Sequence, residues 1–347
     1  MGIFAMMFFL GCYTDDVHPS GLKTLSLDAV TGEMAVVSEM RVSNALYQAL
    51  SPDGTILYSC TGEGLASFRR QEAGAGAWEK VDEVKIGSCV CHVAVMPDGR
   101  RVVFADYMSG FAGSVAVAGG RFGEVTRHQH AGAGPNLPRQ RTAHCHQALP
   151  LPGGAGYVVC DLGLDELVEY PAGRVFKTAP SGAGPRHILF HPNGRLAFLV
   201  SELGNLVSSL VWNAADGFRL IDTLPTLEHA ALPVGPVTNT TNTDLAAAVR
   251  FTPDGKGIVV SNRGENSLVV YGFNEATGRL SFKMRTMLPG SWPRDFIFVT
   301  ETLALVAMER SGDVHALRYV AATGRFDVVS TLGGLFRPVS LTQFAER

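Results

Sequence analysis

The stretch of residues 141–170, RTAHCHQALPLPGGAGYVVCDLGLDELVEY, decides how we interpret the rest of the chain. Two short apolar runs within it are joined by a Pro/Gly turn at residues 152–154, and this pattern predicts a β-hairpin. In an antiparallel pair, the start of the first strand lies beside the end of the second. We therefore expect His146 and Asp161 at the same end of the hairpin, although they are well separated in sequence.

The same hairpin pattern recurs along the chain. Its turn motifs begin at Pro52, Pro97, Pro152, Pro192 and Pro253, at intervals of 45, 55, 40 and 61 residues. A repeat of about 40–50 residues with four short strands is typical of a β-propeller. Two polar segments, residues 127–141 and 227–244, do not fit the repeat, and we expect them to be loops that lead into inner strands.

The ends of the chain supply the remaining strands. Six repeat units begin at Tyr47, His92, His146, His187, Val249 and Arg294. Three expected strands precede them, at residues 3–13, 22–27 and 34–40, and one follows at 338–344. Joining these four strands leaves no open sheet edge. The sequence thus predicts an all-β protein, a seven-bladed propeller of one domain over residues 1–347, closed by the N-terminal strands and one C-terminal strand.

Composition excludes several classes of partner. With a net charge of −3, the chain offers no electrostatic basis for binding nucleic acid or an anionic membrane. The six cysteines are not spaced as a disulfide framework, so we expect reduced thiols and a cytoplasmic protein. The apolar run at residues 3–10 is short for a secretion signal and no basic residue precedes it, so we expect a buried first strand.

Polar residues gather where inner strands start and second strands end. Such positions share one face of a propeller, so we expect them to converge at one mouth of the central channel; they are His92, His146, Arg186, His187, Asp106, Tyr107, Asp161, Glu202 and Arg263. Guanidinium groups bind carboxylate or phosphate in bidentate fashion. A histidine with a pKa near neutrality can deprotonate water. This set of side chains therefore suits a small anionic substrate.

Simpler explanations exist for the same residues. Glu202 and Arg186, or Arg294 and Glu309, could simply pair to hold adjacent strands. Cysteine and histidine neighbours at residues 89–92 and 144–146 suggest a metal, but their spacing is not that of known zinc sites. A Cys145 nucleophile would point away from the face shared by its histidine neighbours. We expect neither a metal nor another cofactor.

Several motifs resemble the propeller-type lactonases, the family of bacterial 6-phosphogluconolactonase and fungal carboxy-cis,cis-muconate cyclase. They are GCYT at 11–14, GPN…RQ…H-x-H at 134–146, PRH at 185–187, SELGN at 201–205 and SNRG at 261–264. The resemblance covers nearly the whole chain and implies seven blades without an essential metal. It implies active-site positions at His146, Arg186, Glu202 and Arg263, with Tyr13 nearby. Ala248 and the segment ERSGD (309–313) depart from the family pattern.

The sequence and the resemblance together predict a lactonase that hydrolyses a sugar lactone, foremost 6-phosphogluconolactone in the pentose phosphate pathway. His146, Glu202 and Arg186 are the predicted catalytic residues, and the predicted substrate-binding residues are Arg263, His92, Asp161, His187 and Tyr13. The general base is His146, or Glu202 assisted by it. Alternatives are a muconate-type lactonising cyclase or isomerase, or a non-catalytic propeller that binds a sugar or a protein. We expect a monomer or weak oligomer.

Overall fold

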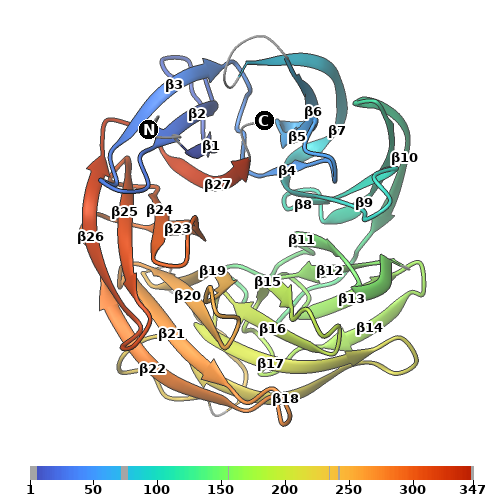
Figure 1. The fold of residues 1–347 in the computed structure, drawn as a ribbon. Helices are drawn as coiled ribbons and strands as arrows, with labels where there is room; N and C mark the ends of the chain where they lie inside the picture. Colours follow the sequence, from blue (N-terminus) through green and yellow to red (C-terminus); the bar gives the residue numbers. More distant parts are fainter. Residues whose placement is uncertain (1–5, 72–76, 155, 234, 241–242, 345–347) are drawn as a thin grey trace.

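The computed structural model describes residues 6–71, 77–154, 156–233, 235–240 and 243–344. In these ranges the chain forms strands and one short 3₁₀ turn, η1 (Pro152–Gly154). Figure 1 shows the strands arranged as blades around a central channel. The predicted all-β, seven-bladed propeller is therefore confirmed. No helix in the described part of the chain is long and apolar enough to cross a membrane.

The first three blades come from the N-terminal part of the chain and the last strand. Blade 1 has the order β27 (Pro338–Phe344), β1 (Met6–Cys12), β2 (Leu22–Leu27) and β3 (Met34–Met40). Blade 2 contains β4 (Gln48–Leu50), β5 (Ile56–Cys60), β6 (Gly62–Arg70) and the first part of β7 (Trp78–Val95). Blade 3 contains the rest of β7, then β8 (Arg101–Asp106), β9 (Phe111–Ala118) and β10 (Arg121–Gln129).

The other four blades follow in sequence order. Blade 4 is β11 (Cys145–Pro150), β12 (Tyr157–Asp161), β13 (Glu166–Tyr170) and β14 (Arg174–Lys177). Blade 5 is β15 (Pro185–Phe190), β16 (Leu196–Ser201), β17 (Leu206–Asn213) and β18 (Gly217–Pro225). Blade 6 is β19 (Leu245–Phe251), β20 (Gly257–Arg263), β21 (Ser267–Phe273) and β22 (Leu280–Met287). Blade 7 is β23 (Pro293–Phe298), β24 (Leu303–Met308), β25 (Asp313–Val320) and β26 (Arg325–Leu332).

Three details differ from the sequence-based expectation. Strand β7 is continuous: its first part pairs with β6 and its last part, from Val90 to Val95, pairs with β8 with Cys91 skipped, so blades 2 and 3 form one seven-stranded sheet. The loop expected at residues 127–141 begins later, because β10 continues to Gln129. Strand β1 begins at Met6; the expected strand residues 3–5 lie outside the described part of the chain.

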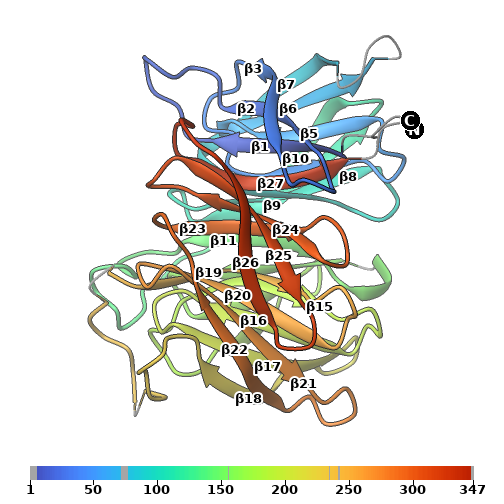
Figure 2. The same ribbon diagram turned by 60° about the vertical axis from the view of Figure 1, so that its left-hand side comes forward.

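The ring is closed by β27, which pairs with β1 in antiparallel register from Met7↔Phe344 to Cys12↔Pro338. Figure 2 shows β27 beside β1, where blade 1 meets blade 7. Leu341 of β27 is buried in an apolar cluster with Phe8 of β1 and Leu305 of β24. One side chain from the end of the chain therefore joins the first and last blades.

A β-bulge recurs near the start of the inner strand in blades 3, 4, 5 and 7. In each case the pairing with the second strand skips one residue; these residues are Cys91, His146, Arg186 and Arg294. A bulge bends its strand and redirects a side chain that the ladder would otherwise align. The same device thus occurs around the channel, always at the same depth of the blade.

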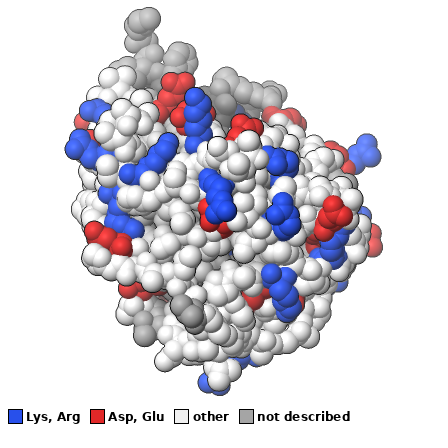
Figure 3. Space-filling view, turned by 90° about the horizontal axis from the view of Figure 1, so that it is seen from below, with Lys and Arg blue, Asp and Glu red and all other residues white. Residues whose placement is uncertain are grey.

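The face of the molecule in Figure 3 carries scattered charges of both signs. On the face in Figure 3, lysine and arginine side chains alternate with aspartate and glutamate, and no continuous patch of one sign is visible. This is in keeping with the net charge of −3. An excess of positive charge is found instead inside the mouth of the central channel, as described below.

The contribution of the closing strand can be measured with two variants of β27. We expect Leu341→Ala to lower the free energy of unfolding by about 2–5 kcal/mol, because it removes buried methyl groups and leaves a cavity. Gln343→Ala, at an exposed position of the same strand, is the control and should change it by less than about 0.5 kcal/mol. Urea denaturation provides the comparison, and equal effects would contradict the role of Leu341.

Candidate functional site

A pocket of about 450 Å³ opens at the channel mouth where inner strands begin and second strands end. Residues at or beside strand ends of all seven blades, together with the loop before β11, form its wall. They are Tyr13, Leu46, Cys89, Cys91, Tyr107, Met108, Arg139, His146, Glu202, Leu245, Arg263, Trp292, Arg294 and Arg310. Three of the bulge residues, Cys91, His146 and Arg294, belong to this wall, so the bulges direct side chains into the pocket.

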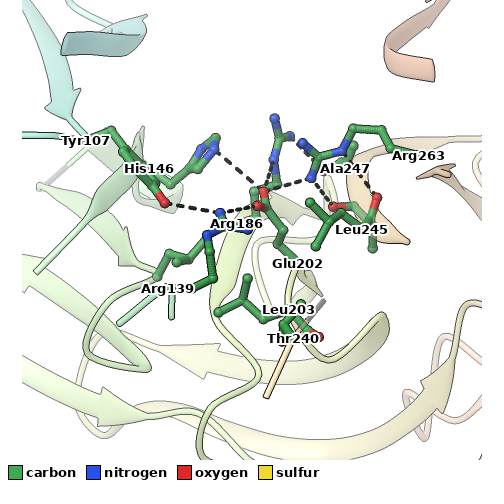
Figure 4. A network of polar contacts seen from close by, with 12 residues as sticks. Tyr107, Arg139, His146, Arg186, Glu202, Leu203, Thr240, Leu245, Ala247 and Arg263 are labelled. Atoms are coloured by element: carbon green, nitrogen blue, oxygen red, sulfur yellow. Dashed lines mark hydrogen bonds and ion pairs between the residues drawn. The ribbon is translucent and has the colours of Figure 1, made fainter. Parts of the chain in front are cut away.

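Glu202, which directly follows β16, is the centre of the polar network in Figure 4. Its Oε2 accepts from Arg186 Nε at 2.9 Å and pairs with Arg263 Nη2 at 2.8 Å. Its Oε1 accepts from Arg139 Nη2 at 2.8 Å. The Glu202 side chain is only 4% exposed. One buried carboxylate therefore holds three guanidinium groups, which leaves the cluster with excess positive charge.

Backbone carbonyls fix two of these guanidinium groups. Arg263 donates from Nε to the carbonyl of Leu245 and from Nη2 to that of Ala246, at 3.2 and 2.9 Å. Arg186 donates from Nη1 to the carbonyl of Ala247 at 2.9 Å. These acceptors lie at the start of β19, where the pairing with β20 is irregular between Ala246 and Val249. The irregular start of blade 6 therefore helps to orient both arginines.

The protonation states follow from burial and charge. Burial by itself would raise the pKa of the Glu202 carboxyl, but Arg263, Arg186 and Arg139 outweigh it and hold that pKa well below its usual range. Burial, followed by the charge of the nearby Arg263, lowers the pKa of Arg186 to about 9. Glu202 is thus an anion at neutral pH, and a weak proton acceptor.

His146 lies beside this network with a different character. Its Nε2 is 4.0 Å from Glu202 Oε2, and its ring meets Tyr107 edge-on with centroids 5.6 Å apart. Burial, followed by the charge of Arg186, lowers the pKa of His146 well below 6.5. Its Nδ1 is buried and has no hydrogen-bond partner among the described residues. His146 is therefore a neutral imidazole at pH 7 with an unused nitrogen.

A second ion cluster lies beside the pocket and contributes Arg294 to its wall. Arg294 donates to Glu309 Oε2 at 2.8 Å, so the expected pair of these residues is confirmed, and Arg337 contacts the other oxygen. The guanidinium carbons of Arg337 and Arg294 lie 4.1 and 5.4 Å from the ring centroid of Tyr13. Tyr13 is thus in the pocket wall, as predicted, and it is held there by two cations.

Two predicted substrate-binding histidines do not line this pocket. His92 and His187 line a separate cavity of about 360 Å³ farther along the channel, together with Tyr47 and Arg250. The rings of His146, His187 and His92 form a row, with centroids 5.2 and 5.8 Å apart. Strand geometry explains why these two histidines line the separate cavity. Successive residues of a strand point to opposite sides, and His92 and His187 each directly follow a bulge residue.

Asp161 also lies away from the pocket, which corrects its predicted role. Its Oδ1 accepts from the backbone N–H groups of His144, Gly163 and Leu164 at 2.9–3.1 Å. Its Oδ2 is 2.7 Å from His130 Nδ1. Both oxygens are therefore engaged in holding the turn after β12. Asp161 does lie at the His146 end of the hairpin, since it pairs with Cys145.

One group of metal-ligating side chains occurs within the described ranges, and it differs from those suggested by sequence. Ligand atoms of His130, Cys145 and Asp161 all lie within 4.8 Å of one another, and all three residues are buried. However, Asp161 already accepts from His130 and from backbone amides, and burial raises the pKa of the Cys145 thiol well above its usual value. These donors suit a hydrogen-bonded structural cluster better than a metal.

Sequence reasoning missed several residues of the pocket wall. Arg139 and Trp292 lie in irregular segments before β11 and β23, where no periodicity indicates side-chain direction. Arg310 follows β24 within the segment ERSGD (309–313), which in the sequence is distinctive only as a departure from the family pattern. The sequence feature that could have indicated a role for Arg139 is the polar, Gly- and Pro-rich loop in which it lies.

Comparisons with known proteins agree with this architecture. A family model described as "Lactonase, 7-bladed beta-propeller" matches residues 7–334. A Bacillus subtilis (strain 168) protein named 6-phosphogluconolactonase is 31% identical over 350 residues, which cover 95% of this chain and 96% of that relative.

Solved structures show the same fold. A Lactobacillus plantarum protein has a TM-score of 0.86 and 26% identity, covering 99% of this chain and 100% of its own. A structure titled as the periplasmic gluconolactonase of Pseudomonas aeruginosa has a TM-score of 0.88 and 23% identity, covering 98% and 99%. The resemblance seen in the sequence is thus confirmed, and the chain belongs to the lactonase family of seven-bladed β-propellers.

Proposed function

We propose that this protein hydrolyses a sugar lactone, and that its substrate is 6-phosphogluconolactone of the pentose phosphate pathway. The observation that carries the proposal is a neutral imidazole, His146, beside a buried cluster of three arginines around one carboxylate. Such a pocket suits an anionic ester that is attacked by water. The name of the Bacillus subtilis relative points to the same substrate.

We assign the role of general base to His146. A general base must be unprotonated at the working pH and must have a free lone pair near the reacting atoms. His146 lines the pocket and is neutral, so one of its ring nitrogens carries a lone pair. Glu202 is ionised, but its three arginines make it a poor proton acceptor. Glu202 is therefore a positioning residue that orients the arginines.

The arginines stabilise the negative charge that develops during the reaction. Water adds to the lactone carbonyl carbon while His146 takes its proton, and the carbonyl oxygen becomes an oxyanion. Guanidinium donors of Arg186, Arg263 and Arg139 would face that oxygen or the anionic substituent. When the ring C–O bond breaks, the imidazolium returns its proton to the leaving alkoxide, and the product is the hydroxy acid.

Substrate binding prepares His146 for this step. Positive charge from Arg186 helps to lower the pKa of His146 in the free protein. An anionic substrate placed among the arginines compensates that charge, so the pKa of His146 rises toward neutrality in the complex. The base thus becomes stronger when the substrate is present.

An activity assay over several lactones can distinguish the proposed substrate from other substrates. Paired arginines bind a dicarboxylate as well as a phosphate, which is the basis of the muconate-type cyclase alternative. A pH-indicator assay over phosphorylated aldonolactones, plain aldonolactones and muconolactones separates these cases, because ring opening releases acid. No turnover of any lactone would favour a non-catalytic binding propeller.

We also propose a cytoplasmic location, because all six cysteines are free in the structure and four of them are buried. The solved structure titled as a periplasmic gluconolactonase is 23% identical to this chain, and that similarity concerns the fold alone. Cell fractionation followed by immunoblotting tests the location, and recovery in a periplasmic or extracellular fraction would overturn it.

The assignment of the base is tested by His146→Ala. We expect kcat on 6-phosphogluconolactone to fall by about 10²–10⁴-fold, the usual effect of losing a general base. His128→Ala is the control, since His128 is part of the outer strand β10 and stacks on Tyr170. A wild-type rate for His146→Ala would show that the mechanism is wrong.

The pH dependence follows from the lowered pKa of His146. The neutral, active form exists above that pKa, so kcat/KM should stay constant as the pH falls to 6.5 and decrease only in more acidic solution. The acid limb of kcat, which reports the substrate complex, should lie at higher pH. Initial rates corrected for spontaneous hydrolysis give both profiles; a kcat limb at the lower pH would contradict the charge coupling.

The positioning role of Glu202 is tested by Glu202→Gln with added anion. Loss of this buried charge leaves three guanidinium groups uncompensated, and we expect a destabilisation of about 3–5 kcal/mol. Inorganic phosphate should raise the denaturation temperature of Glu202→Gln more than that of wild type, because the anion replaces the carboxylate. Glu63→Gln, which breaks an exposed pair with Lys85, should show no such response. Equal phosphate effects on all three proteins would exclude an anion site here.

A further inference from the structure

Arg310 differs from the other arginines of the pocket wall in having no carboxylate partner. Arg139 and Arg263 pair with Glu202, and Arg294 pairs with Glu309. Arg310 forms no ion pair with any of the described residues, and its side chain is exposed at the pocket rim. Its positive charge is therefore available to a ligand.

Trp292 holds the Arg310 guanidinium in place. The guanidinium carbon lies 3.2 Å from the centroid of the Trp292 ring, which is 5% exposed. The backbone N–H of Trp292 donates to Asn266 Oδ1 at 2.8 Å, and that of Arg310 donates to the carbonyl of Ser291 at 3.1 Å. Arg310 is thus preorganised by stacking, although it is at the surface.

The backbone of Trp292 adds a second indication that this arrangement is functional. Its φ angle is +74°, in the left-handed region that bulky residues rarely adopt. Such a conformation costs about 1–3 kcal/mol and is typically maintained at ligand-binding sites. In this case the indole contacts two cations, because Arg263 also lies over the same ring, 5.6 Å from its centroid.

The Trp292 ring also limits the distance between the guanidinium groups of Arg263 and Arg310. Since one guanidinium carbon is 5.6 Å and the other 3.2 Å from its centroid, the two lie at most about 9 Å apart. Arg263 belongs to the cluster beside His146, where the lactone carbonyl would react. A sugar lactone with a phosphate on its far end can span these two points.

We propose that Arg310 binds the terminal phosphate of the substrate and so determines the preference for phosphorylated over plain lactones. This inference rests on the proposed lactonase function and extends it to a specificity-determining residue. A phosphate monoester carries nearly two negative charges at pH 7 and three acceptor oxygens, which match the guanidinium fork. The lactone ring would then extend inward to Arg263 and His146.

The test compares Arg310→Ala, Arg310→Lys and wild type on 6-phosphogluconolactone and on unphosphorylated gluconolactone. For Arg310→Ala we expect kcat/KM on the phosphorylated lactone to fall by about 10–100-fold, mainly through KM, as for loss of a charged hydrogen-bonding partner. The loss on the plain lactone should be at least about tenfold smaller. Arg310→Lys keeps the charge without the fork and should be intermediate.

Arg318→Ala is the matched control, because Arg318 is exposed on β25 of the same blade and forms no ion pair among the described residues. It should leave both reactions unchanged. Equal losses on both lactones for Arg310→Ala, or none on the phosphorylated one, would overturn the proposal.

Calorimetry with inorganic phosphate separates this proposal from the lactonase function. Weaker phosphate binding by Arg310→Ala than by wild type supports the phosphate site even if no lactone is hydrolysed, and in that case the proposed reaction alone fails. Phosphate binding that is absent from wild type, or unchanged in Arg310→Ala, overturns the role of Arg310.

Discussion

The buried carboxylate of Glu202 is the constraint on which the channel mouth depends. It is the counter-ion of Arg139, Arg186 and Arg263, which come from a loop and two different blades. Three cations around one anion are stable only with additional acceptors, and the carbonyls of residues 245–247 supply them. The remaining positive charge is what makes the pocket suitable for an anion, and burial together with this charge keeps His146 unprotonated.

The propeller supplies the geometry for this cluster through a repeated irregularity. A regular ladder would align the side chains of the inner strands with the packed faces of the blades. The bulges at His146, Arg186 and Arg294 release one residue per blade from that alignment. His146, Arg186 and Arg294 therefore reach the same end of the channel through the same local defect, and the closing pair of β1 and β27 keeps their blades in a ring.

Much of this arrangement was predictable, because P-x-G turns fix where hairpins reverse. That argument located the ends of strands, and it brought together His146, Arg186, Glu202 and Arg263 correctly. It could not give the direction of a side chain next to a bulge, so His187 was grouped with the pocket residues although it lines the separate cavity. It was also silent on Arg139, whose position depends on a loop without periodicity.

The strand β7 has a consequence for the way the molecule comes apart. Because one uninterrupted strand is the outer edge of blade 2 and the inner edge of blade 3, neither blade can detach without breaking hydrogen bonds of the other. Most other neighbouring blades are linked by loops, so one of them can open without breaking the hydrogen bonds of the next. Blades 2 and 3 should therefore open as one cooperative unit in amide exchange, and the weaker joints of the ring lie elsewhere.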